Sequence, residues 1–303
     1  MSENIKPFNL AAAQKYNSKV DLKLFDEMLD AEPTLSTRRD GQRFATAVYE
    51  FQKACGLSPH ECDGKLGRQT YGLLVGRMGA VNERVIFDGA PLIMPRRDEY
   101  KLVTFDERDG LDLHRYGNFS PRKGEVSGVC VHWGGLNAQH CFNVFASPAR
   151  KVSSHFLIGL VDGCAVVYQV LDIKHKAWHG GKVNDFTVGV DICQQAGVQW
   201  ADHYEDGGYD LTIINNPSTR GERKVLSLHP ALRTAAALFI KDLMNALSIP
   251  LKPAPDADGI YEDDVDKGRV TLFGHSHVNR RKWDIAPYWA GIIDVIERGD
   301  SVQ

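Results

Sequence analysis

The sequence has no long apolar run, no surplus of positive charge and no closely spaced cysteine pair. A membrane-spanning helix needs about 20 mainly apolar residues, so we expect no membrane insertion. The formal net charge of −3 removes the general electrostatic reason to expect a nucleic-acid partner. None of the six cysteines forms a CxxC pair, which argues against a zinc ribbon or a thioredoxin-type motif. We expect reduced, mostly buried thiols and no disulfide.

The first residues, MSENIKPFNLAAAQKY, lack a basic segment followed by an apolar one, which is the pattern of a signal peptide. We therefore expect synthesis in the cytoplasm without a signal peptide. At 303 residues the chain is longer than one ordinary domain of about 150 residues. Its hydrophobic content of 43% and aromatic content of 9% are those of folded proteins, so two unequal domains are predicted.

Three segments near the N-terminus space apolar residues three and four apart, which predicts short amphipathic helices over 21–30, 42–53 and 65–76. The stretch FQKACGLSPHECDGKLGRQTYGLL resembles the peptidoglycan-binding type 1 repeat, and the resemblance covers roughly residues 20–78. The residues in pattern are Phe51, Gln52, Gly56, Leu57, Asp63, Gly64, Gly67, Thr70 and Leu73. The resemblance implies a wall-binding helical domain over 1–80. A small helical bundle that only tethers another domain is the alternative.

Residues 81–124 are dominated by proline, glycine and charge, and we interpret them as a linker and an entry segment. Short apolar runs follow, whose lengths favour strands: VSGVCVHW, SSHFLIGL, CAVVYQVL, FTVGVDIC and RVTLFGHS. Helical patterns cover 230–248 and 287–298. Residues 125–303 are therefore predicted to form an α/β domain, a central mixed β-sheet flanked by helices, with polar insertions near 197–225 and 252–267.

Two histidines stand at the ends of predicted strands. His132 ends VSGVCVHW, and His275 ends RVTLFGH nine residues before Asp284. Two imidazoles and one carboxylate can hold a catalytic zinc ion and leave a fourth position open. With 11 histidines and 39 acidic residues in the chain, a structural role for either histidine is the alternative, and His277 is a rival of His275.

Four ordered motifs supply a context for these residues: VCVHWGG, VSSHFLIGLVDGCAVVYQV, KAWHGGKVNDFTVGVDI and GHSHVNRRKWDIAP. Together they resemble the amidase-2 family of zinc amidases, which is related to phage lysozyme-amidases and to animal peptidoglycan recognition proteins. The resemblance spans about residues 125–295. It implies an N-acetylmuramoyl-L-alanine amidase that binds Zn²⁺ through His132, His275 and Asp284.

The same resemblance implies roles for residues around the metal. Lys282, in a K-x-D arrangement with Asp284, would stabilise the developing oxyanion. Asp191 takes the place of a glutamate general base; an aspartate that only makes hydrogen bonds at the strand end is the alternative. The candidates for substrate binding are Trp133, His155, His179, Asn184 and Thr187.

These features predict hydrolysis of the amide bond between N-acetylmuramic acid and L-alanine of the peptidoglycan stem peptide. The expected setting is a phage endolysin or phage-like lysin, which a holin or a phage particle would deliver to the wall in the periplasm. A non-catalytic peptidoglycan receptor and a bacterial muropeptide-recycling amidase are the alternatives.

Overall fold

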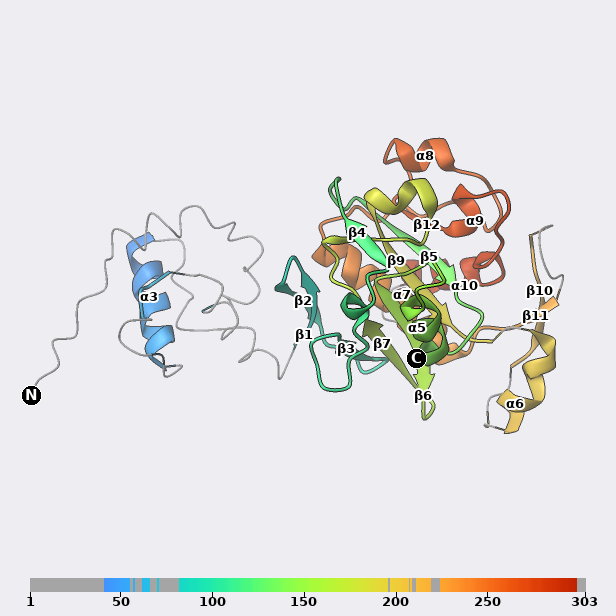
Figure 1. Cartoon of the computed structure of the whole chain (residues 1–303), viewed down its shortest axis with the longest axis horizontal. Helices are drawn as coiled ribbons and strands as arrows, with labels where there is room; N and C mark the ends of the chain where they lie inside the picture. Colours follow the sequence, from blue (N-terminus) through green and yellow to red (C-terminus); the bar gives the residue numbers. More distant parts are fainter. Residues whose placement is uncertain are drawn as a thin grey trace, which may run out of the picture. The chain divides into compact units, whose positions relative to one another are not determined.

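The computed structural model describes residues 41–54, 57, 62–65, 70, 82–195, 197–206, 208, 211–218 and 224–298. The chain divides into two compact units, Met1–Glu83 and Arg84–Gln303 (Figure 1). Each unit is described by itself. The helix expected over 21–30 and most of the one expected over 65–76 lie outside the described residues.

In the first unit, helix α3 (Gly41–Ala54) covers the helix predicted over 42–53. Its buried Gln52 connects the motif residues that follow. The Gln52 side chain donates to the Thr70 hydroxyl at 2.7 Å and to the Asp63 carboxylate at 3.2 Å, and accepts from the Gly64 amide at 2.8 Å. Gly64 has a positive φ of 66°, which glycine adopts without strain. These residues of the repeat pattern thus hydrogen-bond to one another.

The second unit is built on a mixed six-stranded sheet with the order β12-β5-β9-β6-β7-β3. The strands are β12 (Leu272–Gly274), β5 (Gly128–Trp133), β9 (Thr187–Cys193), β6 (Phe156–Val161), β7 (Cys164–Gln169) and β3 (Lys101–Thr104). The first four are parallel to one another, whereas β7 is antiparallel to β6 and parallel to β3. The mixed sheet predicted from the apolar runs is confirmed.

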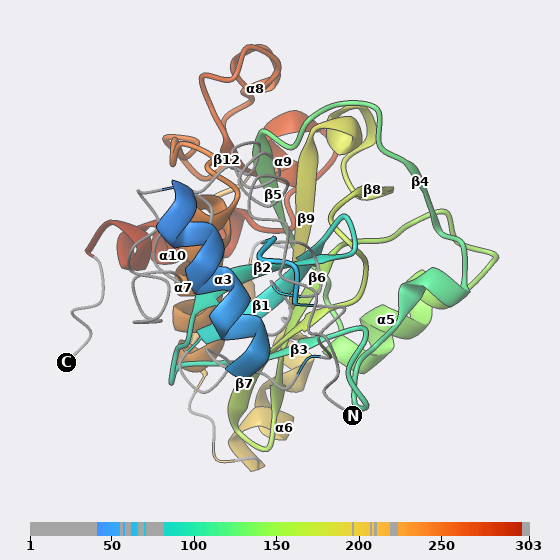
Figure 2. The same ribbon diagram turned by 90° about the vertical axis from the view of Figure 1, so that its left-hand side faces the viewer.

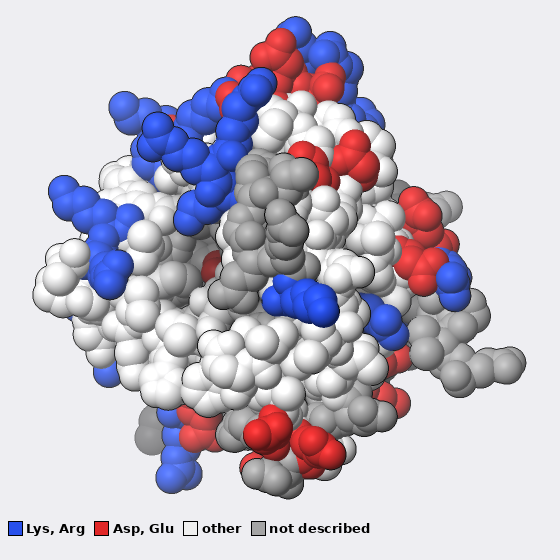
Figure 3. Space-filling model, turned by 90° about the vertical axis from the view of Figure 1, so that its right-hand side faces the viewer, with Lys and Arg blue, Asp and Glu red and all other residues white. Residues whose placement is uncertain are grey.

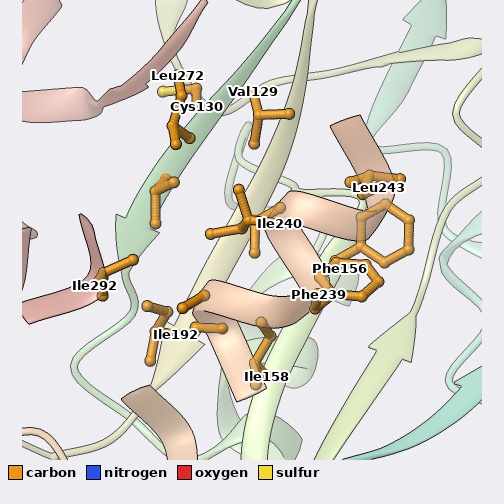
Figure 4. Packing of buried hydrophobic residues seen from close by; sticks show 14 of the residues in the cluster. Val129, Cys130, Phe156, Ile158, Ile192, Phe239, Ile240, Leu243, Leu272 and Ile292 are labelled. Atoms are coloured by element: carbon orange, nitrogen blue, oxygen red, sulfur yellow. The ribbon is translucent and has the colours of Figure 1, made fainter. Parts of the chain in front are cut away.

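Helices cover both faces of this sheet (Figure 2). Helix α7 (Pro230–Ala246) packs on one face with α10 (Ala286–Arg298) beside it, and α5 (Ala138–Ala146) packs on the other. Because side chains alternate along a strand, Phe156 and Ile158 of β6 join the α7 core, seen in Figure 4, whereas Leu157 joins the α5 core. The apolar runs are therefore strands buried on both faces.

The segment predicted as a linker and an entry segment contains strands instead. β1 (Asn82–Phe87) pairs with β2 (Ala90–Pro95), and β3 joins the main sheet. The short helix η3 (Leu113–Arg115) follows. After it, β4 (Phe119–Pro121) pairs with β8 (His175–Ala177). Buried Gln169 exchanges two hydrogen bonds with the Ile86 backbone. The Asp172 carboxylate accepts from the amides of Asp88 and Gly89. Each of these strands contains polar residues or prolines (NERVIF, APLIMP, KLVT and FSP), so none forms a continuous apolar run.

Both insertions contain short elements. The first has η5 (Val198–Trp200), α6 (Ala201–Asp206), β10 (Ile213–Asn215) and β11 (Lys224–Leu226), and the second has α8 (Glu262–Asp266). Short helices η4 (Gly181–Asp185) and α9 (His275–Val278) follow β8 and β12. The described cysteines are free thiols, of which Cys164 is exposed and the others are buried. Among the described helices, none has the length and apolar character to cross a membrane.

Candidate active site

The predicted catalytic residues meet at the carboxyl ends of three parallel strands. His132 lies near the end of β5, directly opposite Asp191 of β9. His275 follows β12, whose last residue, Gly274, is opposite Val131. Ligands commonly bind at this edge of an α/β sheet because the chain leaves the strands there and opens a crevice.

His132, His275 and Asp284 form the cluster that the sequence predicts. One potential ligand atom from each lies within 4.8 Å of the other two. The Asp284 Oδ2 atom is 3.5 Å from His132 Nδ1 and 3.8 Å from His275 Nδ1. Asp284 comes from the loop between α9 and α10. Gly274 is required before His275, since a Cβ there would collide with the Ile285 side chain.

The charges of this cluster fit a divalent metal ion. Burial and the neighbouring His132 lower the pKa of His275 to about 3, which keeps this imidazole neutral and able to coordinate. Burial alone would lower the pKa of His132, but Cys130, Asp191 and Asp284 together raise it well above its usual value, so this position favours a positive charge that a metal ion would supply in place of the proton. Burial would raise the pKa of Asp284, but His132 and His275 reverse this and keep it ionised. The buried Asp284 Oδ1 has no hydrogen-bond partner among the described residues, so a cation would satisfy it.

A second group of potential ligands, Cys130, His132 and His179, shares one imidazole with the first. Burial raises the pKa of the Cys130 thiol, and only a thiolate binds metal well. The group with the carboxylate therefore fits a divalent ion better. His277, the rival of His275, instead accepts a hydrogen bond from the Gly274 amide through Nδ1 at 2.9 Å and packs on Trp289.

A chain of hydrogen bonds leads from His132 away from the cluster. The Thr187 hydroxyl donates to the Val183 carbonyl at 2.8 Å, so its oxygen can accept from His179 Nε2 at 3.4 Å. His179 Nδ1 then accepts from His132 Nε2 at 3.1 Å. With its proton on Nε2, His132 keeps the lone pair of Nδ1, which faces Asp284 and His275.

Asp191 and Lys282 also line the cavity at the cluster, which has a volume of about 360 Å³. Asp191 is buried, and burial raises the pKa of its carboxyl group. Lys282 is exposed, in a turn where its amide donates to the Asn279 carbonyl at 3.0 Å. A carboxylate and an ammonium group thus flank the potential ligands.

Of the residues predicted to bind substrate, Trp133 and His179 line the cavity. The Trp133 indole donates to the Gln194 carbonyl and packs against Trp283, with ring centres 5.6 Å apart. Trp283 stands between Lys282 and Asp284 in the chain, so this contact braces their loop. Sequence reasoning missed Trp283, although its place inside the K-x-D pattern could have indicated it.

His155, Asn184 and Thr187 lie behind the cavity rather than in its lining. The fully buried His155 accepts from the Gly189 amide through Nδ1 at 3.0 Å, and its Nε2 is 3.0 Å from the His175 carbonyl. The Asn184 side chain accepts from the amides of His179 and Gly180. These side chains support the residues that face the cavity.

Arg122 is a supporting residue that sequence reasoning did not identify. Its guanidinium donates to the carbonyls of Ile173, His175, Asn184 and Thr187. Burial lowers its pKa to about 10, so it stays charged at neutral pH. No sequence signal distinguishes it from other arginines in polar segments.

Comparison with known proteins gives the class. The family model described as N-acetylmuramoyl-L-alanine amidase, Amidase_2, matches residues 122–287, more than half of the chain. No curated protein matches the sequence.

Several solved structures are similar to this chain, among them these three. PlyL is 16% identical with a TM-score of 0.37, covering 66% of this chain and 97% of that one. A mutant endolysin from Bacillus subtilis is 16% identical with a TM-score of 0.38, covering 65% and 99%. The N-acetylmuramyl-L-alanine amidase AmiD from E. coli is 15% identical with a TM-score of 0.32, covering 50% and 48%.

The chain belongs to the N-acetylmuramoyl-L-alanine amidase family. It is a hydrolase of peptidoglycan that cleaves the amide bond between N-acetylmuramic acid and L-alanine of the stem peptide.

Proposed function

We propose that this amidase is zinc-dependent and that His132, His275 and Asp284 hold the ion. The observation that carries the proposal is the convergence of their ligand atoms within 4.8 Å, two from buried imidazoles and one from the half-buried Asp284 carboxylate. When bound with one open position, zinc polarises the scissile carbonyl and lowers the pKa of a water molecule. The other steps fall to side chains of the chain itself.

Asp191 is the proposed general base. Its carboxylate lines the cavity beside His132, and burial raises its pKa, which makes it a better proton acceptor than an exposed aspartate. It takes the proton from the attacking water and returns it to the nitrogen of the leaving L-alanine. The Lys282 ammonium group stabilises the oxyanion that develops on the carbonyl oxygen.

His179 and Thr187 are proposed to act through His132 rather than on the substrate. Their hydrogen bonds fix the tautomer of His132 that directs Nδ1 at the cluster. Such orienting partners typically change metal affinity by about 10- to 100-fold when they are removed. Trp133 remains a candidate for substrate contact at the edge of the cavity.

The N-terminal unit is proposed to bind the cell wall. Tethering to an insoluble polymer raises the effective substrate concentration at the active site. The proposed setting is a phage endolysin or a phage-like lysin that reaches the wall through a holin or as part of a phage particle. A bacterial muropeptide-recycling amidase is the second candidate, and a zinc-free peptidoglycan receptor is disfavoured because all three ligand residues and Lys282 are present.

Two measurements test the proposal. Metal analysis of the purified protein should find about one zinc ion per chain, and a chelator should abolish activity until zinc is restored. Mass spectrometry of products from purified sacculi should find free stem peptides that begin with L-alanine together with intact glycan. A protein without zinc that cleaves sacculi at the same rate would refute the metal assignment.

A further inference from the structure

A groove extends from the catalytic cavity along α5 to the first insertion. We name it the α5 groove; it has a volume of about 500 Å³ and ends at Trp200 of η5. Leu136, Val144 and Arg150 line both the groove and the catalytic cavity. The two hollows therefore adjoin, and a polymer bound at the cleavage site can extend toward the groove.

The groove combines apolar surface with oriented amide groups. The Trp200 side chain is 38% exposed and Leu136 is 36% exposed. Tyr204 holds Gln195 through two hydrogen bonds. The Tyr204 hydroxyl donates to Gln195 Oε1 at 3.0 Å and accepts from the backbone N–H of Gln195 at 3.1 Å. This leaves Gln195 Nε2 as a donor for a ligand, since no described residue accepts from it.

The side-chain amide of Asn143, on α5, also has its donors left over for a ligand. The Asn143 Oδ1 atom accepts from Gln139 at 3.2 Å, so its Nδ2 hydrogens are its remaining donors. Both amides line the groove, together with His140. Their donors match acceptors such as acetamido carbonyls and hydroxyl oxygens.

Charge distinguishes the glycan strand of the substrate from its stem peptide. The glycan is neutral and carries hydroxyl and acetamido groups on rings with apolar faces, whereas the stem peptide carries carboxylates. Among the described residues that line the groove, Arg150 is the one fixed charge, at the end shared with the catalytic cavity, and none is acidic. Figure 3 faces the side that bears α6, β10 and β11, where Lys and Arg gather toward the upper left and much of the remaining described surface is uncharged.

We infer that the α5 groove binds the glycan strand next to the reacting muramoyl unit, with a sugar ring packed on the Trp200 indole. Flat aromatic rings bind apolar ring faces with little loss of side-chain entropy. The inference rests on the proposed amidase reaction and adds that the enzyme acts on polymeric glycan in preference to a single-sugar muropeptide.

The test uses the full chain and one stem peptide attached to one, two or four sugars. Wild-type KM should fall as sugars are added. Trp200→Ala should raise KM for the four-sugar substrate by about tenfold, the effect of losing roughly 1.4 kcal/mol of binding energy. It should leave KM for the one-sugar substrate and kcat unchanged. Trp200→Phe should restore most of the four-sugar affinity.

Ile213→Ala is the matched control, because Ile213 is an exposed apolar residue of the same insertion outside the groove. It should behave as wild type. A KM that does not depend on sugar number, or a Trp200→Ala effect that follows peptide length instead, would overturn the inference and assign the groove to the stem peptide.

A binding measurement separates this inference from the amidase proposal. Calorimetry with tetrameric N-acetylglucosamine, which carries no peptide, should detect binding to wild type and about tenfold weaker binding to Trp200→Ala. Failure of wild type to cleave any muropeptide would refute the catalytic proposal alone. Absence of tetramer binding would refute the glycan groove, whatever the activity.

Discussion

Lys282 and Asp284 lie two positions apart in one loop, yet only Asp284 belongs to the proposed ligand set. Lys282→Ala should therefore keep zinc while kcat falls by about 100-fold or more, as is typical when one oxyanion-stabilising group is removed. Asp284→Ala should lose zinc. Metal analysis and steady-state kinetics on both variants measure the difference. Wild-type turnover by zinc-loaded Lys282→Ala would contradict the role of the lysine.

Asp191→Asn isolates the proposed base from the ligands. The amide keeps the size of the carboxylate but cannot accept the proton, so kcat should fall by about 100- to 10,000-fold while zinc content and melting temperature stay close to wild type. Kinetics on a soluble muropeptide provide the measurement. A loss of only a few-fold would instead indicate that Asp191 braces the end of β9.

His155 makes stability depend on pH. Burial and nearby Arg122 lower its pKa to about 3, whereas the unfolded imidazole titrates near 6.5. Below pH 6.5 the unfolded chain therefore binds the extra proton. For this group the free energy of unfolding falls by up to about 1.4 kcal/mol per pH unit as the pH drops from 6.5 toward 3.

His155→Asn removes this titration and keeps an acceptor for the Gly189 amide. It should be less stable than wild type at pH 8, and the difference should shrink at pH 5. Urea unfolding at both values provides the measurement, with exposed His140→Asn as the control that stays near wild type. A difference that does not change with pH would contradict the neutral state of buried His155.

The predicted ligands and their neighbours differ in how far the sequence could locate them. His132 and His275 end strongly apolar segments, and Asp284 stands in the K-x-D arrangement, so strand pattern and motif together predict their convergence. Asn184 and Thr187 occur in the expected order along the chain. This order does not tell whether a side chain enters the cavity or lies behind it. Their contacts behind His179 depend on the turn that follows β8.

At the scale of elements, the buried strands were predictable and the short ones were not. β5, β6, β7 and β9 are continuous apolar runs because both of their faces are covered. β4 and β8 have three residues each and, among the described strands, pair just with one another. Such strands depend on tertiary contacts, here the hydrogen bonds that Arg122 makes to the carbonyls around β8.

Gly189 of β9 is an element-level requirement of the site. A Cβ at this position would lie 2.8 Å from the His179 ring and 2.7 Å from the Ser154 hydroxyl. Gly189→Ala should therefore displace His179, lower zinc affinity and reduce stability by about 1–3 kcal/mol, as overpacking typically does.

Gly291 in α10 offers a matched control for that substitution. Among the residues that the structure describes, a Cβ there would meet just the flexible Arg233 side chain. Gly291→Ala should leave zinc affinity unchanged and stability equal to wild type or up to about 1 kcal/mol higher, because alanine favours a helix over glycine. Zinc titration and thermal unfolding of both variants provide the measurements, and equal behaviour would refute the packing argument.

At the scale of the whole molecule, the boundary between the units decides which fragments fold. The expected domain start at 125 would discard β1 to β4, yet β3 pairs with β7 in the main sheet. The first hairpin also satisfies buried polar groups of the second unit, since Gln169 and Asp172 bond to its backbone. The polar composition of 81–124 hides these pairings, because its strands contain polar residues or prolines and lie among charged turns.

A chain that begins at residue 81 should fold, cleave soluble muropeptides at the wild-type rate and lose binding to sacculi, because it keeps the second unit and lacks the proposed wall-binding domain.

A chain that begins at residue 96 is the comparison. It removes β1 and β2, so Gln169 Oε1 loses the Ile86 amide and the Asp172 carboxylate loses the amides of Asp88 and Gly89. Gln169 keeps its bond to the Leu171 carbonyl, and Asp172 keeps its bond to the Lys174 amide. Each unsatisfied buried group costs about 1–3 kcal/mol, so this chain should melt at a lower temperature. Thermal unfolding, muropeptide kinetics and co-sedimentation with sacculi measure the three properties. Equal sedimentation of the full chain and the chain from residue 81 would refute the wall-binding role of the first unit, and equal melting temperatures of the two shortened chains would refute the contribution of the hairpin.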